Sequence, residues 1–190
     1  MNEGDYVFTD GMPVVWAGKR LHPNQVWERV YGPDVTQWIL HNSDPEKTFH
    51  YFLGSTPETM DKLQSEIKTR FPSAQVVGYE CPPFREPSES ELGARDKRIT
   101  DSGATVVWVG LGTPKQDFEV QRIVRTLPVT AIAVGAAFDF IAHTVPQAPR
   151  WMQNSGLEWG YRLAREPRRL SKRYFWGNPQ FIRSVIKNRP

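Results

Sequence analysis

The sequence predicts an α/β fold in which a parallel sheet is covered by helices and followed by a basic helical appendage. Short apolar runs rich in β-branched and aromatic residues alternate with segments of helical periodicity, which is typical of a parallel sheet. The 190 residues suffice to bury a core, and the single cysteine, Cys81, excludes an internal disulfide framework. Residues 1–149 carry a net charge of −5 and residues 150–190 one of +8. We therefore expect two domains, 1–149 and 150–190.

A strand–helix–strand unit is predicted over residues 49–79. Residues 49–53 (FHYFL) form an apolar run that ends at Gly54, and Thr56 followed by Pro57 is a typical helix start. Residues 75–79 (QVVGY) form the next predicted strand. Between these strands, apolar side chains recur at helical spacing at Met60, Leu63, Ile67 and Phe71.

Two more strands and two more helices complete the predicted sheet domain. Residues 88–91 (SESE) fit a capping box that opens a helix to about Ile99. Residues 105–110 (TVVWVG) are almost continuously apolar, as expected of a strand buried on both faces. Residues 113–114 (TP) open the next helix, and residues 130–135 form the last predicted strand.

The appendage is predicted to contain two helices. Residues 155–158 (SGLE) fit a second capping box, with a helix to about Arg165, and residues 166–167 (EP) open a helix that ends near Gly177. The basic residues of interest are Arg162, Arg165, Arg168, Arg169, Lys172 and Arg173. If the two helices are nearly continuous, most of them share one face. A solvated helix face, a nucleic-acid surface, and a site for a diphosphate or an anionic membrane all fit this pattern.

Several classes of protein are excluded by simple features. The first five residues lack the basic and apolar regions of a signal peptide, and no apolar run is long enough to span a membrane. The four histidines show no ligand spacing, so no metal site is expected. We therefore expect a soluble cytoplasmic protein.

Three segments are expected to lie beyond strand ends, where parallel sheets bind ligands. They are residues 9–13 after the short run 6–8 (YVF), residues 110–117, and residues 135–139. In the second segment, Gly110, Gly112 and Lys115 combine open backbone N–H groups, a helix N-terminus and a cation, which suits a phosphate or diphosphate. A tight strand–helix turn with a solvated lysine is the structural alternative.

Two aspartates in these segments have a structural and a functional interpretation each. Asp10 precedes a Gly-Met-Pro turn, where aspartate is common for local hydrogen bonding. The functional alternative is a general base that activates a hydroxyl. Asp139, in the third segment, has the same two interpretations.

The ordered set of motifs resembles the WecB/TagA/CpsF family of bacterial glycosyltransferases. The resemblance covers nearly the whole chain, through residues 10–11, 28–34, 52–54, 109–117, 134–140, 148–152, 156–163, 166–170 and 173–174. It implies a Rossmann-like fold and an inverting transfer of a sugar from a UDP-sugar to a polyprenyl-diphosphate-linked saccharide, without a metal or other cofactor. N-acetylmannosamine, its uronic acid and glucose are the candidate sugars, for bacterial surface polysaccharides such as exopolysaccharide, teichoic acid or common antigen.

The resemblance also implies roles for particular residues. Asp10 matches the family's candidate base. The resemblance implies donor binding by Arg29 and Gln116, and with the strand-end segments the expected donor-binding residues are Arg29, Gly110, Gly112, Lys115, Gln116, Gly135 and Asp139. Those implied in gripping the acceptor diphosphate and docking on the membrane are Arg162, Arg169, Lys172 and Arg173. The expected location is the inner face of the cytoplasmic membrane, with no nucleic acid bound and homo-oligomerisation left open.

The sequence departs from the family pattern at three points. It begins just before the Asp-Gly motif, so we expect the family's N-terminal strand and donor-binding loop to be missing. Asp117 stands where glutamate is usual, and residues 141–147 replace a segment that usually carries glycine and a basic residue. The alternative function is therefore a truncated, non-catalytic α/β module that binds a nucleotide sugar.

Overall fold

A computed structural model describes residues 6–165, 167, 183 and 185–187. The chain forms two compact units. The sheet unit comprises Met1–Val7 and Gly32–Pro146, and the second unit comprises Phe8–Tyr31 and Gln147–Pro190. Residues 8–31, which the sequence assigned to the first domain, thus group with the residues of the appendage.

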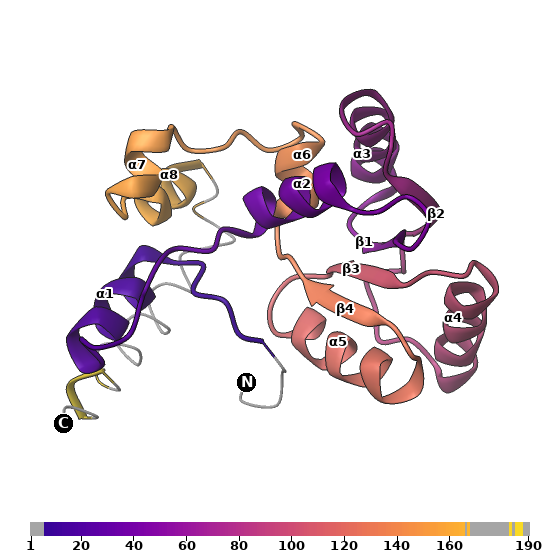
Figure 1. The fold of residues 1–190 in the computed structure, drawn as a ribbon, viewed down its shortest axis with the longest axis horizontal. Helices are drawn as coiled ribbons and strands as arrows, with labels where there is room; N and C mark the ends of the chain where they lie inside the picture. Colours follow the sequence, from indigo (N-terminus) through magenta and orange to yellow (C-terminus); the bar gives the residue numbers. More distant parts are fainter. Residues whose placement is uncertain (1–5, 166, 168–182, 184, 188–190) are drawn as a thin grey trace. The chain divides into compact units, whose positions relative to one another are not determined.

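The sheet unit contains four parallel strands in the order β2-β1-β3-β4 (Figure 1). They are β1 (Phe49–Gly54), β2 (Gln75–Glu80), β3 (Val106–Gly110) and β4 (Thr130–Ala133). The three helices that connect them are α3 (Pro57–Arg70), α4 (Glu89–Asp101) and α5 (Lys115–Thr126). The predicted α/β fold and all seven of these elements are confirmed, with ends that differ by two residues or fewer from those expected.

The two central strands, β1 and β3, are buried on both faces, as their continuous apolar runs predicted. Phe52 and Trp108 face one layer, which is formed by α3, α2 (Gly32–Asn42) and α6 (Ala137–Ile141). Leu53 and Val107 face the opposite layer, formed by α4 and α5 (Figure 1). All four side chains are 0% exposed, because neighbouring residues of a strand point to opposite faces and each face is covered.

Two helix starts follow the capping chemistry that the sequence predicted. The Thr56 side chain accepts a hydrogen bond from the backbone N–H of Thr59, and Pro57 occupies the first turn of α3. Ser88 and Glu91 form a complete capping box at the start of α4. These caps fix where each helix begins after its strand or loop.

Two sequence predictions were wrong. Residues 6–8 are not a strand: they are exposed and irregular, and the chain proceeds into α1 (Met12–Leu21). Ser155 does not cap the following helix, because it ends α7 (Arg150–Asn154) and its hydroxyl donates to the Met152 carbonyl. The helix α8 (Glu158–Arg165) nevertheless lies where a helix was expected.

In the second unit, the two sequence segments that form it pack closely on each other. Gly156 has a φ of +73°, and a Cβ atom at this position would lie 2.5 Å from the Trp16 ring of α1. A larger residue at 156 would therefore strain the positive φ and force the Trp16 ring to move. Most of the second appendage helix predicted from residue 166 lies outside the described residues. Among the helices that are described, none combines the length and apolarity needed to span a membrane.

Candidate functional site

Two of the three predicted ligand-binding segments, residues 110–117 and 135–139, belong to the sheet unit and follow the carboxyl ends of its strands β3 and β4 at one edge of the sheet. From β1 the chain moves outward to β2, and from β3 it moves outward to β4 on the other side. The strand order therefore reverses between β1 and β3, and ligands of open parallel sheets bind beyond the carboxyl ends of strands at such a switch point. Gly54 and Gly110, the last residues of these two strands, are register partners.

Glycine is required at both of these strand ends. Gly54 has a φ of +134°, and a Cβ atom there would lie 2.4 Å from the Gly110 carbonyl oxygen. A Cβ atom at Gly110 would lie 2.7 Å from the ring of Phe138 in α6. The backbones of β1 and β3 thus approach one another closely at their ends, and the Phe138 ring of α6 packs against the Gly110 backbone, which leaves no room for a side chain at either glycine.

Asp139 is held beside this point by residues from two segments. The Ser55 backbone N–H donates to the Gly110 carbonyl at 3.2 Å, and its hydroxyl donates to Asp139 Oδ1 at 3.4 Å. The Thr144 hydroxyl donates to the Asp139 carbonyl at 3.2 Å. Ser55 adopts a left-handed φ of 61°, which is uncommon for a residue other than glycine and directs its side chain toward α6. The sequence analysis missed Ser55 and Thr144.

The loop between β3 and α5 joins the same cluster through Gln116. This side chain is 7% exposed, and its Oε1 accepts a hydrogen bond of 3.1 Å from the backbone N–H of Gly135. Gly112 has a φ of +76° and open space where a Cβ atom would lie. Lys115 is exposed, with its Nζ 3.4 Å from Glu86 Oε1. The structure therefore gathers the expected donor-binding residues Gly110, Gly112, Lys115, Gln116, Gly135 and Asp139 at this edge.

This edge of the sheet suits an anionic ligand. The N-termini of α3 and α5 follow β1 and β3 directly, and helix N-termini present backbone N–H groups and a partial positive charge. Pro114 at the N-cap of α5 supplies no side-chain cap. In the first turn of α5, the N–H groups of Gln116 and Asp117 donate instead to the backbone carbonyls of Gly112 and Pro114, each at 3.0 Å.

Asp10, the candidate base, lies in the second unit directly before α1. It was expected at the end of a strand, but the irregular residues before it rule that position out. Its side chain is 68% exposed, and its Oδ1 lies 3.9 Å from Nη2 of Arg29. The Nε atom of Arg29 donates to the Asp10 carbonyl oxygen at 2.6 Å. Asp10 and Arg29, which are distant in sequence, are thus brought together.

Arg29 is also anchored by the appendage. Its Nη2 donates to Glu158 Oε2 at 2.5 Å, and its guanidinium lies 4.1 Å from the centre of the Tyr31 ring. The Tyr31 hydroxyl donates to Glu158 Oε1 at 3.2 Å and accepts from Gln147 at 3.1 Å. Burial raises the pKa of Tyr31 above its ordinary value, and the neighbouring Glu158 charge adds to the increase. The sequence analysis did not single out Glu158 or Tyr31.

The predicted acceptor-binding residues are described only in part. Arg162 lies in α8, while Arg169, Lys172 and Arg173 lie outside the described residues. The guanidinium of Arg165, at the end of α8, lies 5.5 Å from the centre of the Tyr161 ring. Such contacts are common on helix faces that combine arginine with aromatic residues.

Comparison with known proteins identifies the family. The family model described as Glycosyl transferase WecG/TagA/CpsF family matches residues 1–190. The chain belongs to this glycosyltransferase family. Its members transfer a sugar, so this glycosyltransferase has a nucleotide-sugar donor and a saccharide acceptor.

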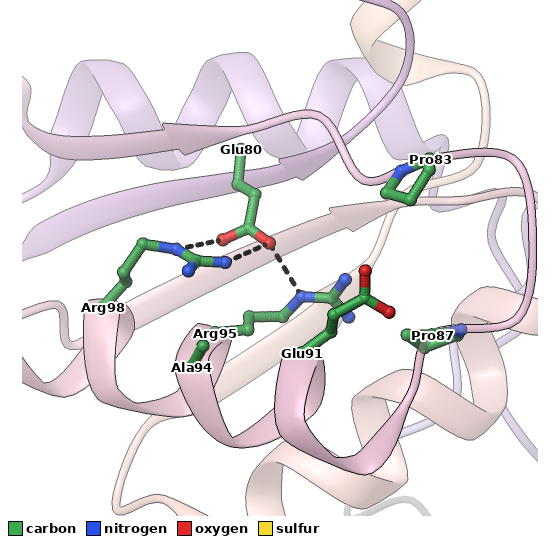
Figure 2. Close-up of a pocket in the computed structure, with 7 residues that line it drawn as sticks. All are labelled: Glu80, Pro83, Pro87, Glu91, Ala94, Arg95 and Arg98. Carbon is green, nitrogen blue, oxygen red and sulfur yellow. Dashed lines mark hydrogen bonds and ion pairs between the residues drawn. The ribbon is translucent and has the colours of Figure 1, made fainter.

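A second polar region of this glycosyltransferase is structural rather than a candidate site. A pocket of about 270 Å³ opens between the end of β2 and α4 (Figure 2). It is lined by Glu80, Pro83, Pro87, Glu91, Ala94, Arg95 and Arg98. Its charged groups already bind one another or adjacent residues: Glu80 accepts from both arginines, and Glu91 from Arg85 and Ser88.

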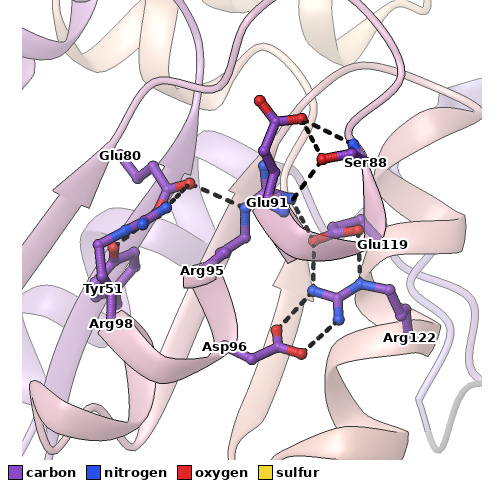
Figure 3. A network of polar contacts seen from close by, with 9 residues as sticks. All are labelled: Tyr51, Glu80, Ser88, Glu91, Arg95, Asp96, Arg98, Glu119 and Arg122. Atoms are coloured by element: carbon purple, nitrogen blue, oxygen red, sulfur yellow. Dashed lines mark hydrogen bonds and ion pairs between the residues drawn. The ribbon is translucent and has the colours of Figure 1, made fainter. Parts of the chain in front are cut away.

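The pocket borders a buried ionic network that joins β2, α4 and α5 (Figure 3). Arg95 donates to Glu80 at 3.0 Å and to Glu119 at 2.8 Å, and Arg122 binds Asp96 through two bonds of 2.8 Å. Burial alone would raise the pKa of Glu119, but hydrogen bonds from Arg122 and Arg95 outweigh it and lower that pKa. The network therefore holds charged groups in place between secondary-structure elements.

Neither region of this glycosyltransferase offers an evident metal centre. Within residues 6–165 and the few described beyond them, no three His, Cys, Asp or Glu side chains gather in a way that could hold a metal ion.

Proposed function

We propose that this protein is an inverting, metal-independent glycosyltransferase. It would transfer N-acetylmannosamine, its uronic acid or glucose from a UDP-sugar to a saccharide linked to a polyprenyl diphosphate. The product would enter bacterial surface polysaccharide synthesis. The observation that carries the proposal is the gathering of glycine backbone, helix N-termini, Gln116 and Asp139 at the switch point of the sheet.

The switch-point residues are proposed to bind the donor. The two phosphates of a UDP-sugar need N–H donors, which the β3–α5 loop is proposed to supply, aided by the partial positive charge at the N-termini of α3 and α5. Lys115 would add a cation beside the diphosphate. Asp139, oriented by Ser55, would accept hydrogen bonds from sugar hydroxyls.

The second unit is proposed to supply the base and the acceptor site. An inverting transfer is a single displacement in which one base removes a proton from the acceptor hydroxyl. Asp10 is exposed enough to meet a hydroxyl, and it is proposed to be this base. The second unit has thirteen Lys and Arg against four Asp and Glu, which favours a polyprenyl diphosphate and an anionic membrane surface. Arg162, Arg169, Lys172 and Arg173 are the proposed contacts.

A direct test combines the purified chain with UDP-sugars and a polyprenyl-diphosphate-linked saccharide. Sugar transfer with inverted anomeric configuration, measured by NMR of the product, supports the proposal. The same rate is expected in EDTA, and a loss of activity restored by a divalent cation would overturn metal independence. Donor binding without transfer or hydrolysis would favour the non-catalytic alternative instead.

The role of Asp10 is tested by Asp10→Asn. A general base contributes about 10²–10⁴-fold, so kcat should fall by that factor while the Kd for the UDP-sugar stays within twofold of the wild-type value. Glu28→Gln is the matched control, because Glu28 is an exposed carboxylate of the same unit and the substitution removes the same charge. An unchanged kcat in Asp10→Asn would remove Asp10 as the base.

A further inference from the structure

Glu158 is a largely buried acidic residue of the second unit. It is the first residue of α8, and its side chain is 13% exposed. Both of its oxygens are engaged: Oε2 accepts from Arg29 and Oε1 from Tyr31. A carboxylate removed from water in this way is stable only while its cationic and hydroxyl partners stay in place. Glu158, Arg29 and Tyr31 therefore form one fixed cluster.

This cluster ends at Asp10. The same Arg29 guanidinium that binds Glu158 through Nη2 donates through Nε to the backbone carbonyl of Asp10. The segment is also pinned next to it, because the Val30 N–H donates to the Thr9 carbonyl at 2.9 Å. The position of the Asp10 backbone thus depends on where Arg29 is held.

Glu158 also determines what Arg29 does to the Asp10 side chain. The Nη2 atom lies 2.5 Å from Glu158 but 3.9 Å from Asp10 Oδ1, so the guanidinium bonds Glu158 and leaves the Asp10 carboxylate outside hydrogen-bonding distance. Without the Glu158 charge, the Asp10 carboxylate is the next acidic group in reach. A carboxylate bonded directly to arginine is a weaker base, because its charged form is stabilised.

We propose that Glu158 is a positioning residue that holds Arg29 on the backbone of Asp10 and keeps its Nη2 beyond hydrogen-bonding distance of the Asp10 carboxylate, with which it forms only a long ion pair. This inference rests on the proposed function of Asp10 as base, and it gives Arg29 a role in orienting the base. It also gives the appendage a part in catalysis apart from ligand binding, because α8 provides the carboxylate on which the arrangement depends.

The kinetic test compares Glu158→Gln with Glu158→Asp and with Glu28→Gln as the control. We expect kcat to fall at least tenfold in Glu158→Gln while the Kd for the UDP-sugar stays within twofold. Glu158→Asp keeps the charge and should recover most of kcat, and Glu28→Gln should match the wild type. Equal kcat in Glu158→Gln and wild type would overturn the proposal, as would a rise of the donor Kd in step with the fall of kcat.

Amide hydrogen exchange provides a test that needs no activity. In Glu158→Gln the Val30 amide should exchange at least tenfold faster, while core amides such as those of Leu53 and Trp108 keep their rates. Unchanged exchange at Val30, or faster exchange throughout the sheet, would contradict a local positioning role. A wild-type protein that transfers no sugar would refute the proposed function, whereas the Val30 exchange would still decide whether Glu158 orders this segment.

Discussion

Acid should destabilise the sheet unit through one buried histidine. His50 in β1 is 0% exposed, and its Nδ1 accepts a hydrogen bond of 3.2 Å from Trp108 Nε1. Because an indole N–H only donates, Nδ1 carries no proton, and the proton of the neutral ring lies on Nε2, 3.0 Å from the Ser43 hydroxyl. Protonation would place a second N–H against Trp108, inside the apolar layer between the sheet and α3.

The size and direction of the effect follow from the pKa of His50. Burial lowers this pKa from 6.5 to about 4. Between these values the unfolded chain binds a proton that the folded protein does not. The contribution of neutral His50 to the free energy of unfolding is therefore fully present above pH 6.5 and is lost as the pH falls to 4 and below. The difference corresponds to about 3 kcal/mol in the free energy of unfolding, at about 1.4 kcal/mol per pH unit.

The assay is urea denaturation from pH 7.5 to 4, with His50→Asn as the reference. The Oδ1 atom of asparagine lies where Nδ1 of histidine lies, so it can accept from Trp108, and asparagine does not titrate in this range. The difference in unfolding free energy between wild type and variant should shrink by about 3 kcal/mol as the pH falls. A difference that stays constant would show that His50 is protonated as readily in the folded protein as in the unfolded chain.

Three further stability predictions use the same denaturation assay. Gly54→Ala should cost about 2–5 kcal/mol from strain at positive φ and the clash with the Gly110 carbonyl, whereas Gly93→Ala, with open space in α4, should gain up to about 1 kcal/mol. Arg95→Ala leaves two buried carboxylates without their shared cation and should cost about 3–5 kcal/mol. Ser88→Ala removes the capping box of α4 and should cost about 1 kcal/mol. Equal stabilities of the two glycine variants, or losses below 0.5 kcal/mol in the other two, would contradict the reasoning.

The sheet could be predicted because its signals are local. The run at residues 105–110 has the composition of a doubly buried strand, and Ser88 with Glu91 sits within one helical turn, so neighbouring residues alone determine both elements. The short run at residues 6–8 looked similar but is irregular and exposed, because composition does not reveal whether a strand finds a partner. Local patterns therefore sufficed where the element is long and buried.

The candidate site was predictable only in part, because its contacts join distant segments. The glycines near β3 and Gln116 belong to one continuous motif. Ser55 was overlooked because its value lies in a left-handed backbone that turns it toward Asp139, 84 residues away. Glu158 was overlooked because a glutamate at a helix start is ordinary, and its pairing with Arg29 spans 129 residues.

The division into units changes how the net charge of +3 is understood. By residue count the sheet unit has eleven Lys and Arg against seventeen Asp and Glu, a net charge of −6, and the second unit carries +9. The long-range field of the sheet unit therefore opposes a nucleotide diphosphate, and Lys115 is close to Glu86. If the donor binds there as proposed, its diphosphate would rely on short-range contacts with N–H groups of the β3–α5 loop rather than on the long-range field. In the second unit, by contrast, the excess positive charge attracts anions at long range. Among the described residues, Glu158 is the only acidic side chain that forms a hydrogen bond with Arg29.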